Sequence, residues 1–165
     1  MSVETLFLEA SAAKLRQFTE RISVCLGKLT ADQVWARGHE NENAVGNLVL
    51  HLSGNIRQWV ISGLGGEPDV RVRDREFSTL DGIAPAELTS LIRGTVEEAT
   101  AVIAGLTIER LTRVYEIQKT RLTAVEALMH VVPHFCEHTG QIIFATKSAT
   151  GEDLAFYSPR NPRST

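Results

Sequence analysis

The stretch TAVEALMHVVPHFCEHTGQIIFATKS, residues 123–148, decides the fold. It opens with Thr123 and, three residues later, Glu126, which is the capping-box pattern of a helix start. Apolar side chains then recur every three or four residues, the spacing of one helix face, and we expect this face to pack in the core: Val125, Leu128, Val132, Cys136 and Thr139. We predict one long amphipathic helix, which Pro133 bends because it removes a backbone hydrogen bond.

Three further long segments show the same helical periodicity. They cover residues 3–29, residues 44–64 and a segment from Pro85, a residue suited to a first helical turn, to Gly105. A capping box, Thr30 with Gln33, predicts an additional short helix over residues 30–37. The chain therefore contains four long helices.

The connections between these helices differ in length. The charged stretch VRVRDREFSTLDGI, residues 70–83, is expected to be a long loop, whereas TRVYEIQ, residues 112–118, alternates enough for a short strand. We predict an all-α fold, a four-helix bundle with a long connection between helices 2 and 3. It forms one domain over residues 1–157, followed by a loose C-terminal tail, residues 158–165.

Composition excludes several functional classes. The 165 residues carry a formal net charge of -3, which argues against nucleic acid or an acidic membrane surface as a partner. No apolar run approaches the roughly 20 residues needed to cross a bilayer. The N-terminal residues lack the basic and apolar regions of a signal peptide, so we expect a cytoplasmic protein with reduced thiols.

Three histidines of the last helix, His130, His134 and His138, follow one another at intervals of four residues. Imidazoles at this spacing lie about 40° apart around a helix axis and can bind one divalent ion together. A catalytic ion needs a third protein ligand, and His51 in the second long helix is the best donor elsewhere. Cys136 points about 200° away from His134, and we expect it to be a buried core thiol.

The helical wheel leaves a second interpretation open. On an ideal helix, His134 and His138 lie about 120° to 160° from the expected apolar face, as solvated surface histidines would. A bend at Pro133 makes this wheel unreliable, so periodicity does not decide between the two. On the second long helix, further polar side chains share the stripe of His51 and are candidates for hydrogen bonds to a ligand or to substrate: Asn47, Asn55 and Gln58.

Three segments, NLVLHLSGNIRQW (residues 47–59), RDREF (73–77) and HFCEHTGQIIFATK (134–147), resemble the DinB/YfiT-like superfamily of small metal-binding four-helix bundle proteins. The resemblance extends from the first helix to about Tyr157. It implies that His51, His134 and His138 bind a divalent metal ion (nickel, zinc or iron), and it gives His130 no role. Superfamily members with assigned activities include thiol S-transferases that use bacillithiol, mycothiol or glutathione, a maleylpyruvate isomerase and metal-dependent hydrolases.

The first functional hypothesis is an enzyme that activates a low-molecular-weight thiol, or water, at an open three-histidine site. Candidate general bases are Glu137, Glu76 and Asp74, although solvated surface carboxylates are the norm. Candidate substrate contacts are Arg73 and Arg75, which could clamp a carboxylate or pair with their acidic neighbours, together with Asn55 and Gln141.

Two other hypotheses remain open from the sequence. One is a non-catalytic, stress-related metal-binding bundle that acts through dimerisation or partner binding, with Trp35 and Trp59 either in the interface or in the core. The other is a ligand-carrying bundle without metal, which requires His51 to lie far from His134 and His138. A homodimer is compatible with both the enzyme and the metal-binding bundle.

Overall fold

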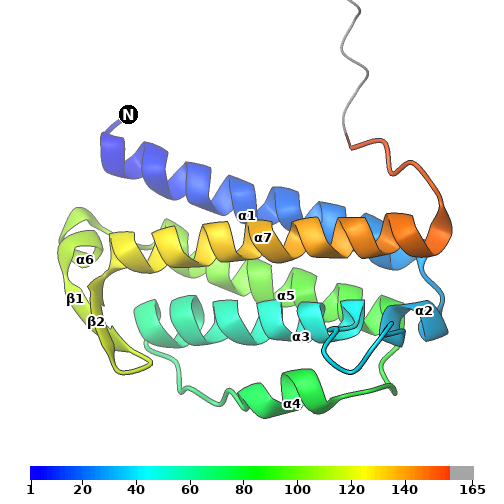
Figure 1. Ribbon diagram of the computed structural model, residues 1–165. Coiled ribbons are helices and arrows are strands. Elements are labelled where there is room, and N and C mark those ends of the chain that lie inside the picture. The colour runs from blue at the N-terminus through cyan, green and yellow to red at the C-terminus, as the bar shows by residue number, and fades with distance from the viewer. Residues whose placement is uncertain (157–165) are drawn as a thin grey trace, which may run out of the picture.

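A computed structural model describes residues 1–156, so the predicted tail, residues 158–165, lies outside the described part. Four long helices pack side by side as a bundle (Figure 1). They are α1 (Val3–Lys28), α3 (Val45–Ile56), which continues as the π-helix η1 (Arg57–Leu64), α5 (Pro85–Ala104) and α7 (Ala124–Thr150). This confirms the predicted all-α four-helix bundle.

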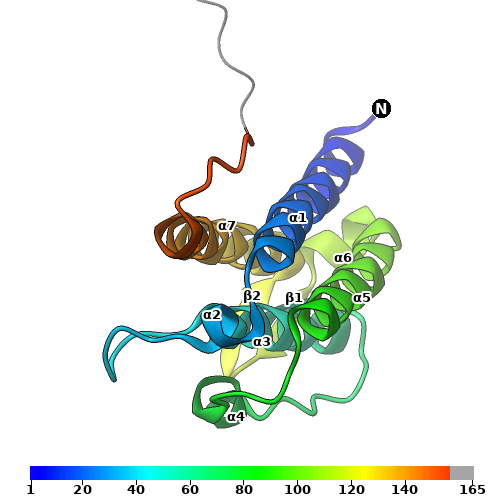
Figure 2. The same cartoon turned by 90° about the vertical axis from the view of Figure 1, so that its right-hand side faces the viewer.

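The direction of the helices explains the long connection between the second and the third. Helices α1 and α7 run one way, and α3 and α5 run the other way (Figure 1). Because α3 and α5 are parallel, residues 65–84 must return along the whole bundle before α5 begins. This crossover passes along the outer side of α3, as the end-on view in Figure 2 shows.

The crossover contains a short helix, α4 (Arg73–Ser78), where the sequence predicted a loop over residues 70–83. That part of the prediction was wrong. Six residues are too few for a helix that is stable by itself, so α4 depends on its packing against α3. Its buried side chain is Glu76, which faces the bundle.

Small elements complete the fold. Helix α2 (Ala31–Trp35) has the predicted capping box, and α6 (Ile108–Thr112) follows α5. Strand β1 (Val114–Ile117) lies where a short strand was predicted, and it pairs antiparallel with β2 (Thr120–Thr123), which was not predicted. The two residues between them, Gln118 and Lys119, both have positive φ, as a tight two-residue hairpin turn requires.

Helix α7 runs without interruption through Pro133, but its buried face differs from the predicted one. The core receives Ala124, Ala127, Leu128, Val131, Phe135, Thr139 and Ile142. Val125 and Cys136 are exposed, and Val132 is only half-buried. The expectation of a buried Cys136 thiol was therefore wrong. Apolar residues occur at helical spacing on two neighbouring faces of α7, and only the face that includes Phe135 meets the core, where its ring stacks 6.5 Å from that of Phe18.

The two tryptophans belong to the packed interior rather than to an exposed surface. Trp59 is buried, and Trp35 is half-buried and donates a hydrogen bond from Nε1 to the carbonyl oxygen of Ile83 at 3.0 Å. Among residues 1–156, no helix is both long enough and apolar enough to span a membrane.

Candidate metal centre

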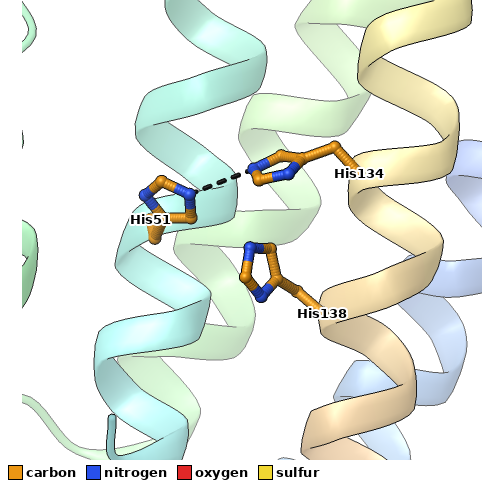
Figure 3. A group of neighbouring side chains, drawn as sticks. All are labelled: His51, His134 and His138. Atoms are coloured by element: carbon orange, nitrogen blue, oxygen red, sulfur yellow. Dashed lines mark hydrogen bonds between the residues drawn. The ribbon is translucent and has the colours of Figure 1, made fainter. Parts of the chain in front are cut away.

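The fold brings together three histidines that are far apart in the sequence. His51 projects from α3 toward α7, and His134 and His138 project from successive turns of α7 toward α3 (Figure 3). One ring nitrogen from each lies within 4.8 Å of the others, so all three can reach one metal ion. A bundle that carries a ligand without metal required His51 to lie far away, and its position removes the basis of that hypothesis.

The position of the histidines on α7 follows from the face of this helix that packs in the core, which is the face that includes Phe135. His134 precedes Phe135, so it lies about 100° around the helix from it, and His138 lies about 60° to the same side. Both imidazoles therefore flank the core, beside α3, and are half-buried, while His51 is 6 % exposed. The interpretation as solvated surface histidines is wrong for these three side chains.

The side chain of Glu76 orients His51. Its Oε2 atom lies 2.9 Å from Nδ1 of His51. An ionised carboxylate can only accept a hydrogen bond, so Nδ1 carries the proton. The second nitrogen, Nε2, then carries no proton, and it accepts a hydrogen bond from Nε2–H of His134 at 3.0 Å in the absence of an ion. A carboxylate on the distal nitrogen is the usual support of a histidine that binds metal.

Gln141 orients His138 in the same way from one turn further along α7. Its side-chain oxygen Oε1 lies 2.7 Å from Nδ1 of His138, which therefore donates the hydrogen bond. The Nε2 lone pair of His138 is free as a result. Two of the three imidazoles are thus held in the form in which Nε2 faces the shared centre (Figure 3).

Arg71 keeps Glu76 ionised. Its Nε and Nη2 atoms donate to the two carboxylate oxygens at 2.7 and 2.8 Å, a bidentate pair, and Nη1 donates to Oε1 of Gln58 at 2.9 Å. Burial alone would raise the pKa of Glu76, but the hydrogen bonds and charges of Arg71 and His51 outweigh it and lower the pKa. A negative charge is therefore maintained beside His51.

Close packing against α3 fixes the position of this carboxylate. A Cβ atom added to Gly54 would overlap the Glu76 carboxyl group and lie 3.1 Å from Nε of Arg71, so only glycine fits there. Asn47, also on α3, donates from Nδ2 to the carbonyl oxygens of Glu76 at 2.9 Å and Thr79 at 2.7 Å, which anchors α4. The helix that carries His51 thus also positions its carboxylate partner.

The surroundings keep the imidazoles of α7 neutral. Burial, together with the positive charges that His138 and His51 carry when protonated, lowers the pKa of His134 to about 4. Burial also lowers the pKa of His138. Neutral imidazole is the form that binds metal, so both side chains are ready to bind an ion at neutral pH.

The other predicted site residues lie at different distances from this centre. Glu137 is exposed but close enough for its charge to raise the pKa of His138 against the effect of burial. Asn55 is buried in α3, and within the described residues none of the hydrogen bonds of the three histidines goes to it. Asp74, Arg73 and Arg75 are exposed on α4, and the Arg73 guanidinium lies 4.9 Å from the ring centre of Phe77.

Other residues surround the three predicted ligands without belonging to them. His130 stays outside the metal-ligand group, as expected, and its ring lies between those of Trp59 at 4.1 Å and His134 at 5.7 Å. Arg71, by contrast, was missed: only its place beside the acidic residues of VRVRDREF marks it, and that pattern equally fits a solvated loop. Asn47 and Gln58, considered because they share the stripe of His51, do belong to the surrounding hydrogen-bond network.

A groove adjoins the centre on the side of α7. It has a volume of about 570 Å³ and lies between α7 and the segment that precedes α3. Its lining includes Gln141 and Glu137 from α7, Phe144 further along that helix, and Asn41 and Asn43 opposite. The groove thus places polar and apolar surface next to the residue that orients His138.

Solved structures share this fold at low sequence identity. A conserved protein from Enterococcus faecalis matches with a TM-score of 0.74 and 16 % identity, over 92 % of this chain and 99 % of that one. A DinB-like protein from Bacillus cereus matches with a TM-score of 0.71 and 16 % identity, over 91 % and 97 % of the two chains. The DinB-like protein YjoA from Bacillus subtilis matches with a TM-score of 0.68 and 18 % identity, over 92 % and 99 %.

Sequence comparison gives the family. No protein among the curated ones matches the chain. The family described as "Protein of unknown function (DUF1572)" matches residues 2–161, which is nearly the whole length. The chain belongs to this family, DUF1572, and it shares its fold with the two DinB-like proteins.

Proposed function

We propose that this protein is a divalent-metal-dependent enzyme whose three-histidine site, His51, His134 and His138, activates a low-molecular-weight thiol for S-transfer, or water for hydrolysis. One observation carries the proposal: three imidazole nitrogens converge within 4.8 Å, and two of the rings, those of His51 and His138, are held with Nε2 unprotonated. Three donors are one fewer than a closed structural zinc site uses, which favours an open coordination position.

The chemistry of the donor set fits a nickel, zinc or iron ion. Because all three ligands are neutral, a bound divalent ion would keep its full charge and act as a Lewis acid that lowers the pKa of a thiol or of water. Glu76 and Gln141 hold the ligands in position. The carboxylate of Glu76 already accepts hydrogen bonds from Arg71 and His51, so we assign the role of general base to Glu137, which accepts no such hydrogen bond from any residue in the described part of the chain.

Substrate binding is part of the same proposal. The groove beside Gln141 accepts the substrate, with Gln141 and Glu137 at the end nearest the metal centre. Arg73 and Arg75, exposed on α4, lie outside the lining of this groove, so their contact with a substrate carboxylate stays a prediction, as does a substrate contact of Asn55. We place the reaction in the cytoplasm, where low-molecular-weight thiols are kept reduced.

The test begins with elemental analysis of untagged protein after incubation with zinc, nickel and ferrous iron. We expect about one metal equivalent in the wild type, none in His138→Ala, and the wild-type amount in His130→Ala, which alters the neighbouring histidine outside the ligand group. Absence of metal in all three proteins would contradict the proposal.

Activity is then measured with the ion that binds. Thiol transfer is assayed with bacillithiol, mycothiol and glutathione, and hydrolysis with ester and amide substrates. Turnover that disappears in His138→Ala and falls in Glu137→Gln, at unchanged metal content in the latter, supports the enzyme. Metal binding without turnover in any assay would favour the non-catalytic metal-binding bundle instead.

A further inference from the structure

A second cavity, with a volume of about 380 Å³, lies between α3, α5 and the crossover. Helix α4 and the crossover lie on the side of α3 that is turned away from α7 (Figures 1 and 2). The described residues that line this cavity include none of the three histidines, and none of them lines the groove beside Gln141. Small-molecule sites have volumes of about 300–1,000 Å³. The cavity is therefore large enough for a small molecule that does not contact the metal centre.

The wall of the cavity is mostly apolar and partly open to solvent. Its aliphatic side chains come from α3, the crossover and α5: Leu50, Val70, Val72, Ile83 and Leu91. Val70 is 70 % exposed and Val72 is 53 % exposed. Covering such side chains removes apolar surface from water, which favours the binding of a ligand that is itself apolar along this wall.

The charges around the cavity balance except for one. Arg71 is paired with Glu76, as described above, and both line the cavity. Arg57 lines it too and donates from Nη2 to Oε2 of Glu98 at 2.7 Å. Arg75 is the third arginine of the lining, and it has no ion-pair partner in the part of the chain that the structure describes. One positive charge is left for a ligand, and a guanidinium pairs well with a carboxylate.

A buried hydroxyl group of the lining has no partner either. Ser53 is 6 % exposed, and its Oγ atom forms no hydrogen bond with any described residue. Helical serines and threonines often donate to the carbonyl oxygen four residues earlier, as Thr95 of the same lining does to Leu91 at 2.8 Å. Since buried polar groups are normally hydrogen-bonded, the Ser53 hydroxyl indicates a ligand oxygen at this depth.

We propose that this cavity binds a small monocarboxylate that has an apolar chain and an oxygen acceptor at its far end. Arg75 is exposed and Ser53 is buried, so the two polar contacts lie at different depths, with the aliphatic wall between them. The carboxylate pairs with Arg75 at the opening, and the far oxygen accepts a hydrogen bond from Oγ of Ser53. Arg75 thus has a ligand other than the substrate of the metal centre.

Binding is tested on untagged protein by isothermal titration, in one sample with zinc and in another with a chelator. The probes are octanoate, ω-hydroxyoctanoate, which adds the far oxygen, and octanol, which lacks the carboxylate. We expect both carboxylates to bind in both samples, ω-hydroxyoctanoate more tightly than octanoate. Octanol should bind at least about tenfold more weakly than octanoate, because Arg75 then lacks its partner.

The location of the bound probe is read from the amide NMR spectrum of the chelator-treated protein. Signals of Ser53 and Leu91, in the lining of the cavity, should shift on addition of ω-hydroxyoctanoate. Signals of Gly140 and Phe144, in the groove beside Gln141, should not.

Two variants test the polar contacts through the preference between probes. Arg75→Gln should remove the preference for octanoate over octanol, whereas Arg73→Gln, on the same helix but outside the lining, should keep it. Ser53→Ala should remove the preference for ω-hydroxyoctanoate over octanoate. Because the Ser53 hydroxyl has no partner among the described residues, its loss breaks no hydrogen bond of the fold. A merely structural effect would change the affinity for all probes alike.

A further variant tests the apolar wall. Leu91→Glu places a negative charge in the lining, so the dissociation constant of octanoate should rise at least about tenfold. Ser90→Glu adds the same charge to the neighbouring exposed position of α5, outside the lining, and should bind octanoate as the wild type does.

Several results would overturn the inference. They are the absence of binding of either carboxylate at millimolar concentration, octanol bound as tightly as octanoate, no gain from the far hydroxyl, and preferences that survive Arg75→Gln and Ser53→Ala. Binding only in the zinc sample would assign the carboxylate to the metal centre instead, and NMR shifts confined to the other groove would do the same for that groove. The chelator sample needs no metal, so failure of the proposed function leaves this test intact.

Discussion

The Nδ1 atom of His51 lies 2.9 Å from Oε2 of Glu76, while the Nε2 atom of the same ring lies 3.0 Å from Nε2 of His134. The two contacts make the crossover segment part of the centre, since α4 carries the carboxylate that sets the tautomer of a histidine on α3. A long connection that joins two parallel helices thereby contributes to the chemistry of the bundle.

Removing the charge of Glu76 tests this relationship. We expect Glu76→Gln to lower metal affinity by about 10- to 100-fold, because His51 loses the acceptor that orients it. Competition with a chromophoric chelator measures the change. Asp74→Asn, which neutralises an exposed acid on the same helix, should retain the wild-type affinity. Equal affinities in both variants would show that Glu76 does not position the ligand.

Gly54 provides a steric test of the same contact. Alanine usually stabilises a helix relative to glycine, but here its Cβ would overlap the Glu76 carboxyl group. We expect Gly54→Ala to lower the free energy of unfolding by about 1–3 kcal/mol and to weaken metal binding. Gly94→Ala is the matched control, because nothing lies within 4 Å of its added Cβ, and it should raise stability by about 0.5–1 kcal/mol. Both are measured by urea unfolding; a stabilised Gly54→Ala would contradict the packing.

Gln141 is expected to support the third ligand. Replacing it with alanine removes the acceptor 2.7 Å from Nδ1 of His138, so the ring can turn and change tautomer. We expect a loss of metal affinity of about tenfold, the lower end of the effect of removing such partners. Isothermal titration in parallel with Glu137→Gln, which should bind metal as the wild type does, separates the two neighbouring polar residues. Affinity unchanged in Gln141→Ala would contradict its positioning role.

The metal-free protein should become less stable as pH falls from about 6.5 toward 4. Burial holds the pKa of His134 at about 4 in the folded state, against 6.5 for the ordinary side chain, so in this window the unfolded chain binds a proton that the folded chain does not. The contribution of His134 to the free energy of unfolding is fully present above pH 6.5. Urea unfolding between pH 7 and 5 with a chelator should show this slope, reduced in His134→Gln. The window lies above the range in which Glu76, whose pKa is lowered, gains a proton. A slope equal in both proteins would contradict the assignment.

The sequence by itself determined the helices and the positions of the donors along them. Capping boxes at Thr30 and Thr123 mark helix starts that the structure reproduces, because caps act within a few residues of the chain. The spacing of His134 and His138 likewise follows from helix geometry alone. The long crossover was predictable in length, since no periodic pattern interrupts residues 70–83.

Only the tertiary structure decided which face of α7 is the core and which residues hold the ligands. Two apolar faces of α7 have the same helical spacing, and no local rule ranks them: packing against Phe18 selects Phe135 over Cys136. Glu76 contacts His51 across 25 residues of chain, Arg71 holds the Glu76 carboxylate in place, and α4 is too short to form without α3. Such contacts depend on how the helices pack against one another, and the periodicity of the sequence does not predict that packing.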